Sequence, residues 1–397
     1  MSSKLVVAGV GMIPFKKPGT SAGYADMGAE AIRLALADAG MPYDLIQQAY
    51  AGYVYGDSTC GQAALYRVGV TGIPVLNVNN NCASGSSALY LARQAVESGA
   101  VECALAFGFE EMQPGALGSR WTDREAALNQ FTTLAEPMVG DAVEAGVPRA
   151  LTLFGGAGRE HMQKYGTKFE TFAKIRAKAS RHAEHNELAI FRKVLSTEDV
   201  LGDVQVWPNV MTRLMACPPT CGAAAAIICT GAFAKQHNLR TDVRILAQSL
   251  TTDVPSSFEP PSMIRLVGFD MARKAALAVY EAAGVSPQDV DVCELHDCFA
   301  QNELLTYESL GFCPEGGGEK FVEDGANTYG GQVVTNPSGG LLSKGHPLGA
   351  TGLAQCYELT NQLRGGAGKR QVEGARIALQ HNLGLGGACV VTMYGRA

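Results

Sequence analysis

The chain has 397 residues, more than one hydrophobic core usually organises, so two or three domains are expected. Its 47% hydrophobic and 18% charged residues are typical of a compact globular protein and not of a disordered one. The net charge of −6, without a basic stripe, argues against a nucleic-acid partner. No apolar run approaches the roughly 20 residues of a membrane helix, and the first residues lead directly into a strand pattern and not into a signal peptide.

The eleven cysteines are expected to be reduced thiols, since the long chain shows no secretion signal. No Cys-x-x-Cys pair occurs, which argues against a structural zinc site. No G-x-G-x-x-G run precedes a helix, so the glycine-rich stretches do not predict a dinucleotide site.

The first predicted element is a buried strand over 5–11, followed by a helix over about 24–38 that Gly40 ends as a C-cap. From Ala31, a predicted helix is followed by a glycine, a turn with a proline and a strand. The same order of elements recurs from Ala275. This weak internal duplication predicts two α/β halves related by pseudo-symmetry. The two halves also end alike. A helix of small residues over 86–96 is followed by a strand pattern over 102–107, and a similar helix over about 351–363 is followed by a strand pattern over 376–380.

Between the halves the character of the chain changes to charged helices and irregular segments rich in proline and glycine. This predicts a loop domain that emerges from the first half, and functional loops often lie on such excursions. The predicted division is 1–112 and 216–258 for the N-terminal half, 113–215 for the loop domain and 259–397 for the C-terminal half.

Cys82 is the first candidate catalytic residue. It follows an apolar strand and opens a helix, where the unpaired N–H groups and the helix dipole favour a thiolate. The small residues after it, 83–87, would let a substrate carbonyl approach closely. The alternative is a buried core cysteine, which is the commoner fate of this residue type.

Two histidine motifs are further candidates. His346 lies between Gly345 and Pro347 before a helix start, where an imidazole could face a cleft as a base or simply bond to the backbone of the turn. His296 and Cys298 come at the end of an apolar strand, and strand alternation would place both on one face. For this pair, a metal half-site and ordinary packing are the alternatives to acid–base chemistry.

The glycine run over 384–387 follows a strand, and its bare N–H groups suit a carbonyl oxygen that becomes negative, although a structural turn would look the same. Cys217 and Cys221 flank a proline pair, and the sequence does not decide whether they lie near a ligand. The remaining histidines in polar segments are expected on solvated faces: His161, His182, His185 and His237.

In this order and spacing, the chain resembles the thiolase superfamily along nearly its whole length. Within it, the chain is most similar to the thiolase of the sterol carrier protein X type, also called the non-specific lipid-transfer group. The stretches that carry the resemblance are 56–61, 79–85, 296–299, 302–307, 327–331, 343–352 and 380–384.

The resemblance implies a five-layered αβαβα sandwich of two halves with a loop domain over the active site. It implies that Cys82 is the nucleophile that becomes acylated and that His346 activates it. Most thiolases carry Asn-Glu-Ala-Phe where this chain has 296–299, and their acid/base cysteine where this chain has Gly384. In the sterol carrier group the second cysteine lies in the His-Asp-Cys-Phe motif, so Cys298 takes that role by resemblance.

The implied activity is CoA-dependent thiolytic cleavage of a 3-ketoacyl-CoA, or the reverse condensation. His296 and His346 would stabilise the enolate oxygen, and the N–H groups of Cys82 and Gly386 would form the oxyanion hole. CoA and acyl-CoA are substrates, with the adenosine end along 113–215 and near Cys217. No metal and no permanently bound cofactor is required.

Three alternatives are weighed against this function. A decarboxylating ketoacyl synthase shares the fold but does not need Cys298, and a steroid side-chain aldolase of the lipid-transfer group lacks the nucleophilic cysteine. A lipid-binding scaffold would not need Cys82, His296, Cys298 and His346 together.

The expected partners are a second copy, as a homodimer, and an accessory lipid-transfer protein, with no nucleic acid or membrane. The ending 395–397 is not a peroxisomal Ser-Lys-Leu signal and carries no sterol-carrier domain, so a cytoplasmic enzyme is expected.

Overall fold

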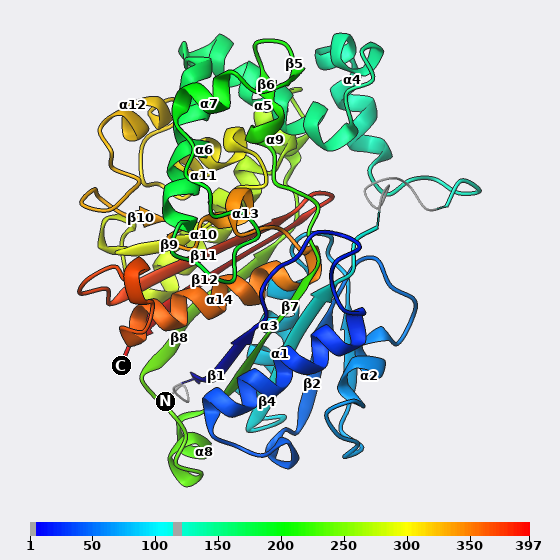
Figure 1. The fold of residues 1–397 in the computed structure, drawn as a ribbon, viewed down its shortest axis with the longest axis vertical. Coiled ribbons are helices and arrows are strands. Elements are labelled where there is room, and N and C mark those ends of the chain that lie inside the picture. Colours follow the sequence, from blue (N-terminus) through cyan, green and yellow to red (C-terminus); the bar gives the residue numbers. More distant parts are fainter. Residues whose placement is uncertain (1–4, 114–120) are drawn as a thin grey trace.

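The computed structural model describes residues 5–113 and 121–397 (Figure 1). Residues 1–4, the start of the predicted N-terminal half, and residues 114–120, in the predicted loop domain, lie outside the described residues.

Within the described residues, each half of the chain contributes five strands to the sheet. In space the N-terminal strands run β3-β2-β4-β7-β1 and the C-terminal strands run β10-β9-β11-β12-β8. If the strands of each half are numbered from one to five along the chain, the two halves have the same order in space: 3-2-4-5-1. The N-terminal strands are β1 (Leu5–Met12), β2 (Gln48–Gly52), β3 (Val75–Val78), β4 (Cys103–Glu110) and β7 (Gly222–Thr230). The C-terminal strands are β8 (Val243–Thr251), β9 (Val292–Glu294), β10 (Val334–Thr335), β11 (Ile377–Gly384) and β12 (Ala388–Arg396).

The strand directions repeat as well as the order. In each half the third, second and fourth strands are parallel, and the fifth strand is antiparallel to both of its neighbours. The two halves meet where Val6 of β1 pairs with Arg244 of β8, which joins the two five-stranded layers into one ten-stranded sheet. The predicted pseudo-symmetry of the two halves is therefore confirmed.

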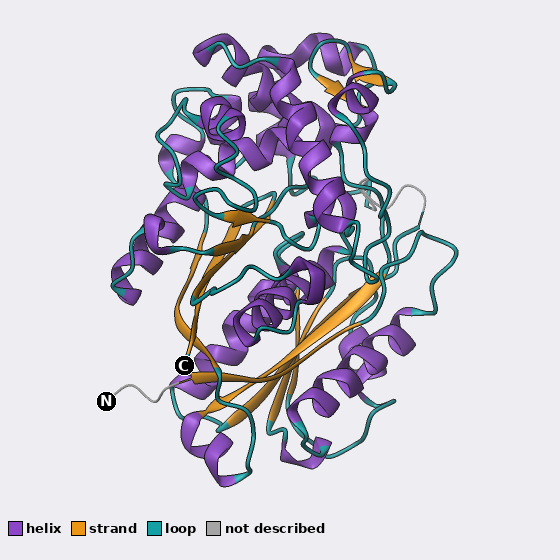
Figure 2. Ribbon diagram, turned by 60° about the vertical axis from the view of Figure 1, so that its left-hand side comes forward, coloured by secondary structure: helices purple, strands orange, loops and turns teal. Residues whose placement is uncertain are grey.

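Helices cover both outer faces and fill the space between the layers. α1 (Tyr24–Ala39) packs on β1 and β7 from outside, and α10 (Phe269–Ala283) packs on β8 and β12. The central layer is α3 (Ser84–Glu97) and α14 (Leu348–Arg364), which contact each other and strands of both halves. Figure 2 shows these central helices enclosed between the two parts of the sheet. The predicted αβαβα sandwich is confirmed.

The strand β7 shows why the sequence produces two buried faces. Its run of alanine and isoleucine is apolar at every position, as expected for a strand covered on both sides. Ile227 belongs to the core cluster under α1, whereas its neighbour Ile228 belongs to the cluster around α3 and α14. Successive side chains point to opposite faces, so one short strand contributes to two hydrophobic cores.

The inserted region packs on the C-terminal half. Its helix α6 (Phe169–Ala183) shares one hydrophobic core with α11 (Ala300–Ser309), and Figure 1 shows both in the upper lobe. The remaining elements of the insertion are α4 (Asn129–Glu144), α5 (Arg149–Tyr165), α7 (Thr197–Leu201), β5 (Gln205–Trp207) and β6 (Met211–Thr212). The short helices elsewhere are α2 (Cys60–Leu65), α8 (Gly231–Gln236), α9 (Met263–Leu266), α12 (Gly318–Glu323) and α13 (Gly340–Ser343).

One predicted boundary needs correction. The segment 216–258 was expected to belong wholly to the N-terminal half. However, β8 pairs with β12 from Val243 to Thr251 and is the first strand of the C-terminal set. The change of halves therefore lies before Val243. The local pattern could not show this, because strand pairing is decided by partners more than a hundred residues away.

None of the described helices is long and apolar enough to cross a membrane.

Candidate active site

Cys82 lies in the turn between β3 and α3. Asn81, in the left-handed region with φ of 50°, reverses the chain just before it. The Asn81 side chain donates to the Leu385 carbonyl at 3.0 Å, and the Ser84 hydroxyl donates to the Asn81 carbonyl at 2.7 Å. The turn is therefore attached both to its own helix and to the loop between β11 and β12 in the other half.

His346 lies just before α14, and its ring is oriented by that helix. Its Nδ1 is 2.7 Å from the Thr351 hydroxyl, and this hydroxyl also donates to the Pro347 carbonyl at 2.9 Å. Because the hydroxyl hydrogen is used by Pro347, the hydroxyl oxygen accepts from Nδ1–H. The neutral ring therefore has its lone pair on Nε2, which is buried and makes no hydrogen bond within the described residues.

His296 lies beyond the end of β9 and is almost fully buried. Its Nδ1 is 3.1 Å from the side-chain nitrogen of Asn382 in β11, and the same nitrogen is 3.1 Å from the Cys82 carbonyl. Its backbone is held as well, since the Asn302 side chain donates to the His296 carbonyl at 2.5 Å. The ring thus occupies one position between the two halves.

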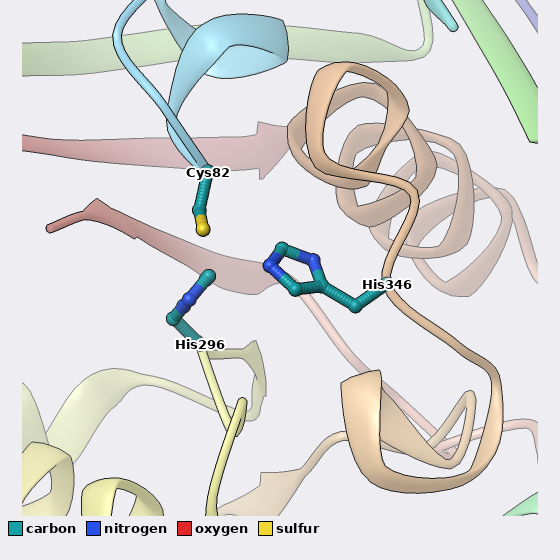
Figure 3. Close-up of side chains that lie close together, drawn as sticks. All are labelled: Cys82, His296 and His346. Carbon is teal, nitrogen blue, oxygen red and sulfur yellow. The ribbon is translucent and has the colours of Figure 1, made fainter. Parts of the chain in front are cut away.

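These three residues converge although they come from distant parts of the chain. The Cys82 sulfur and one ring nitrogen each of His296 and His346 lie within 4.8 Å of one another. The two rings meet edge to face, with centroids 5.0 Å apart and planes at 83°. Figure 3 shows the Cys82 side chain directed toward both imidazoles. One thiol and two imidazoles therefore face a common point.

His296 and Cys298 do not lie on one face of a strand, contrary to the prediction. β9 ends at Glu294, so neither residue lies on a strand whose alternation could place them on one face. The loop that follows is instead anchored by Asp297, whose carboxylate accepts from the backbone N–H groups of Leu341 at 2.7 Å and Leu342 at 3.3 Å. Since α13 leads into the segment that carries His346, Asp297 ties the two histidine loops together.

Cys298 is buried next to Cys217. The N–H of Cys217 donates to the Cys298 carbonyl at 2.9 Å, and Ala216 pairs antiparallel with Phe299. This register sets Cys217 opposite Cys298. Burial raises the pKa of Cys298 well above its ordinary value, and the neighbouring thiols of Cys217 and Cys82 raise it further. The thiols of Cys217 and Cys82 therefore lie close enough to Cys298 to affect its pKa. The sequence did not indicate that Cys217 belongs to this group.

The ionisation state of the site differs from the sequence expectation. Burial raises the pKa of the Cys82 thiol to about 12, and the nearby Glu110 carboxylate adds to this rise. Burial also lowers the pKa of His346 to about 3. Loss of water at the site therefore opposes the thiolate that the helix start was expected to favour. Burial favours a neutral thiol beside a neutral imidazole in the unliganded site.

Glu110 holds the N-terminal half against the His346 helix. Its buried carboxylate accepts from the N–H groups of Tyr55 at 2.9 Å, Gly349 at 3.0 Å and Val54 at 3.2 Å. Burial raises its pKa to about 7, although these hydrogen bonds oppose the rise. A single side chain at the end of β4 therefore positions both the loop after β2 and the first turn of α14.

Gly384 permits the close contact between β11 and the Cys82 turn. A Cβ at this position would overlap the carbonyl oxygen of Asn80. A side chain such as cysteine therefore cannot be accommodated there without moving the turn. Beside Gly384 lies a cavity of about 510 Å³ that is bounded by 79–81, 124–128, Arg149 and 384–388, and it includes Gly386.

Two histidine expectations were wrong. His161 and His182 are buried and not solvated. His161 contacts Thr167 at 2.8 Å and Glu308 at 2.9 Å, and His182 Nε2 contacts Thr328 at 2.8 Å. The polar helices that carry them pack against the C-terminal half, so these faces are covered by a partner far away in the chain.

The positioning residues were missed at the sequence level. Thr351, Asn382, Asp297 and Glu110 are each buried and bonded to a chain segment that carries a candidate catalytic group. Asp297 follows His296 and Asn382 follows His381 in the sequence. A neighbouring histidine was the one local signal that could have indicated these two positioning residues. Their partners are remote in sequence, which is why their contacts could not be predicted.

Comparison with known families gives two matches along the chain. Residues 5–197 match the sequence model described as the thiolase N-terminal domain, and residues 260–394 match the one described as thiolase C-terminal domain-like.

Individual relatives extend this similarity over nearly the whole chain. Sterol carrier protein 2 of Oryctolagus cuniculus is 54% identical over 395 residues, which are 98% of this chain and 72% of the rabbit protein. The non-specific lipid-transfer protein-like 2 of Caenorhabditis elegans is 47% identical over 98% of this chain and 96% of the worm protein. Among solved structures, the "Ltp2-ChsH2(DUF35) aldolase" has a TM-score of 0.84 at 19% identity and covers 99% of this chain and 98% of that one. The last likeness concerns the fold alone.

Proposed function

The chain belongs to the thiolase family and is a thiolase-type acyltransferase; from this premise we propose that it cleaves 3-ketoacyl-CoA with CoA. The products are acetyl-CoA or propionyl-CoA and a shortened acyl-CoA, formed in the degradation of fatty acids or sterol side chains. The observation that carries the proposal is the convergence of the Cys82 sulfur with ring nitrogens of His296 and His346 within 4.8 Å.

The first step is attack by Cys82 on the 3-keto carbon. His346 presents a lone pair on Nε2, and Cys82 is a neutral thiol, so proton transfer accompanies the attack and does not precede it. The developing oxyanion needs donors, for which we propose the N–H groups of Cys82 and Gly386. One such donor contributes about 3 kcal/mol in measured oxyanion holes.

The second step breaks the carbon–carbon bond and releases the enolate of acetyl-CoA or propionyl-CoA. We assign stabilisation of its thioester oxygen to His296 and to His346, which carries the Cys82 proton at this stage. Cys298 protonates the α-carbon, and it then accepts the proton of the incoming CoA thiol. The resulting CoA thiolate takes the acyl group from Cys82, and the Cys82 sulfur recovers its proton from His346, so both cysteines and His346 return to their starting state.

Cys298 is the second thiol of the proposal for a steric reason. In most thiolases, by the resemblance, the acid/base cysteine occupies the position of Gly384, but here a Cβ would overlap the Asn80 carbonyl oxygen. Cys298 is instead a cysteine whose pKa is raised by the nearby Cys82 thiol. This second sulfur favours a thiolase over a decarboxylating ketoacyl synthase, and Cys82 itself favours a thiolase over an aldolase.

We propose that CoA enters through the cavity of about 510 Å³ beside Gly386. Arg124 and Arg149 line it from the inserted region, and their guanidinium groups suit the phosphates of CoA. This agrees with the expectation that 113–215 holds the adenosine end. Cys217 does not line the cavity but neighbours Cys298, so its place is near the thiol end of the substrate.

We also propose a homodimer. β3 is the edge strand of the N-terminal layer, and Leu76 on it is 40% exposed, so its unpaired backbone and apolar side chains suit a second copy. We propose an accessory lipid-transfer protein as a further partner. The fold neighbour named the "Ltp2-ChsH2(DUF35) aldolase" carries two component names, which supports an accessory partner of some kind.

The test of function uses the purified chain, CoA and a panel of 3-ketoacyl-CoAs with straight, 2-methyl-branched and steroid side chains. Loss of the absorbance of the 3-keto–magnesium complex reports cleavage, and intact mass reports an acyl group on the protein. We expect cleavage of at least one substrate class and an acyl adduct that Cys82→Ala abolishes. Full thiolysis by Cys82→Ala would refute the proposed nucleophile, and full thiolysis by Cys298→Ala would refute the second role.

A further inference from the structure

We propose that Asn382 is a positioning residue that holds His296 with its proton on Nε2, so that His296 meets the substrate as a hydrogen-bond donor. Its meaning for catalysis rests on the proposed thiolase reaction, but the tautomer itself is a property of the free protein. Asn382 lies in β11 and is fully buried.

The assignment follows from the two contacts of one amide nitrogen. This nitrogen is 3.1 Å from the Cys82 carbonyl oxygen and 3.1 Å from His296 Nδ1. A carbonyl oxygen only accepts hydrogen bonds, so the amide atom facing it is the NH₂ group. An NH₂ group has no lone pair to offer, and its second hydrogen therefore goes to Nδ1, which accepts it.

The ring of His296 carries only one proton. Burial lowers the pKa of His296 well below its ordinary value, and the neighbouring rings of His346 and His381 lower it further. In a neutral imidazole with Nδ1 accepting, the proton is on Nε2. Nε2 has no hydrogen-bond partner in the described part of the chain, so its N–H is free for a substrate oxygen.

Asn382 and Thr351 thus impose opposite tautomers on the two histidines. The Thr351 oxygen accepts from Nδ1 of His346 and leaves a lone pair on Nε2 of that ring. Asn382 donates to Nδ1 of His296 and leaves a proton on Nε2. Two identical side chains with rings 5.0 Å apart are therefore made into one base and one acid by their neighbours.

The same amide works against metal binding. The Cys82 sulfur and two imidazole nitrogens within 4.8 Å would be a suitable donor set for zinc. A zinc-bound histidine needs a lone pair toward the metal and usually donates its other N–H to an oxygen acceptor. Asn382 presents a donor to His296 where such a site needs an acceptor.

The first experiment measures the tautomer directly. Protein labelled with ¹⁵N at histidine is examined by NMR, and the His296 signals are assigned with His296→Asn. We expect Nε2 to be protonated and Nδ1 unprotonated in the wild type, and the reverse in Asn382→Asp, whose carboxylate accepts from Nδ1–H. Gln380→Ala is the matched control, because Gln380 is a buried amide on the same face of β11 that bonds Ser86 and Gly352. Protonated Nδ1 in the wild type would overturn the proposal.

The second experiment separates positioning from folding. We expect Asn382→Ala to slow exchange of the α-protons of acetyl-CoA with deuterated water by about 100-fold, as for loss of one oxyanion donor. Alkylation of Cys82 by iodoacetamide, which does not use His296, should keep the wild-type rate. An equal fall in both rates would assign Asn382 a merely structural role. If the wild type exchanged no protons, the proposed function would fail, whereas the NMR result on the tautomer would stand.

The third experiment looks for a gain of binding. Asn382→Asp should bind Zn²⁺ about 10–100-fold more tightly than wild type, as expected when a ligating histidine acquires an acceptor behind it. Titration against a competing chelator gives the affinity, and Asn382→Ala serves as the control without an acceptor. Equal zinc affinity in Asn382→Asp and Asn382→Ala would contradict the role proposed for the amide.

Discussion

The Nδ1 of His346 lies 2.7 Å from the hydroxyl of Thr351, five residues further along the chain on the first turn of α14. The helix that follows His346 therefore orients its ring and determines which nitrogen faces Cys82. The hydroxyl is itself fixed by its bond to the Pro347 carbonyl, so the arrangement does not depend on the rest of the site.

Replacing Thr351 by valine keeps the volume and removes the hydroxyl. We expect acylation of Cys82 to slow by about 10–100-fold, by analogy with the loss seen when the hydrogen-bond partner behind a metal-bound histidine is removed. Single-turnover acylation by a 3-ketoacyl-CoA measures this. Thr360→Val, in the same buried helix and bonded to the Cys356 side chain, is the control. An unchanged acylation rate in Thr351→Val would show that His346 needs no partner.

The rate of Cys82 alkylation should show no inflection at a pH near the ordinary histidine pKa. The raised pKa of Cys82, about 12, means that the thiolate fraction grows throughout the range from pH 6 to 10. We expect the iodoacetamide rate to rise about tenfold per pH unit across that range, without a plateau. A plateau beginning near pH 6.5 would instead indicate a thiolate–imidazolium pair in the free enzyme.

The buried histidines should make the protein acid-sensitive. The pKa values of His182, His346 and His381 are each lowered by burial to about 3. These three histidines therefore bind more protons in the unfolded chain than in the folded chain once the pH falls below about 6.5. Their contribution to stability is fully present above that pH and is lost progressively toward pH 3. Glu110, whose pKa is raised by burial to about 7, contributes in the opposite sense, and we expect the histidines to outweigh it. Urea midpoints at pH 7.5, 6 and 5 test this, and equal midpoints at constant ionic strength would contradict it.

Removing the Glu110 carboxylate should loosen the contact between the two halves at the site. Glu110→Ala leaves three backbone N–H groups without their acceptor, at a cost of about 1–3 kcal/mol for each buried group. We expect a lower melting temperature together with slower acylation, and a smaller effect in Glu110→Gln, which keeps one acceptor oxygen. The prediction fails if Glu110→Ala melts at the wild-type temperature.

Adding a methyl group at Gly384 should displace the Cys82 turn. The new Cβ would overlap the Asn80 carbonyl oxygen, so Gly384→Ala is expected to lower the acylation rate strongly. In Gly366→Ala the nearest atoms would lie 3.6 Å or more from the new Cβ, so this variant controls for a glycine-to-alanine change. Circular dichroism distinguishes a local displacement from unfolding. Wild-type acylation by Gly384→Ala would mean that the turn adapts without cost.

The local pattern of the sequence determined a large part of this protein. The apolar strands, the helices that end at glycines such as Gly40, and the repeated order of elements predicted two α/β halves, and the strand order confirmed them. Cys82 and His346 stood out because each lies at a helix start in a turn of small or rigid residues. These features depend on neighbours within a few residues, which a sequence records directly.

The tertiary structure alone decided how those residues are used. It assigned β8 to the C-terminal layer, buried His161 and His182, and raised the pKa of the Cys82 thiol by burial. It also placed Asn382 beside His296, 86 residues earlier in the chain, where one amide selects the tautomer of the ring. Strand pairing, loss of water and hydrogen-bond direction all depend on atoms that only the folded chain brings together.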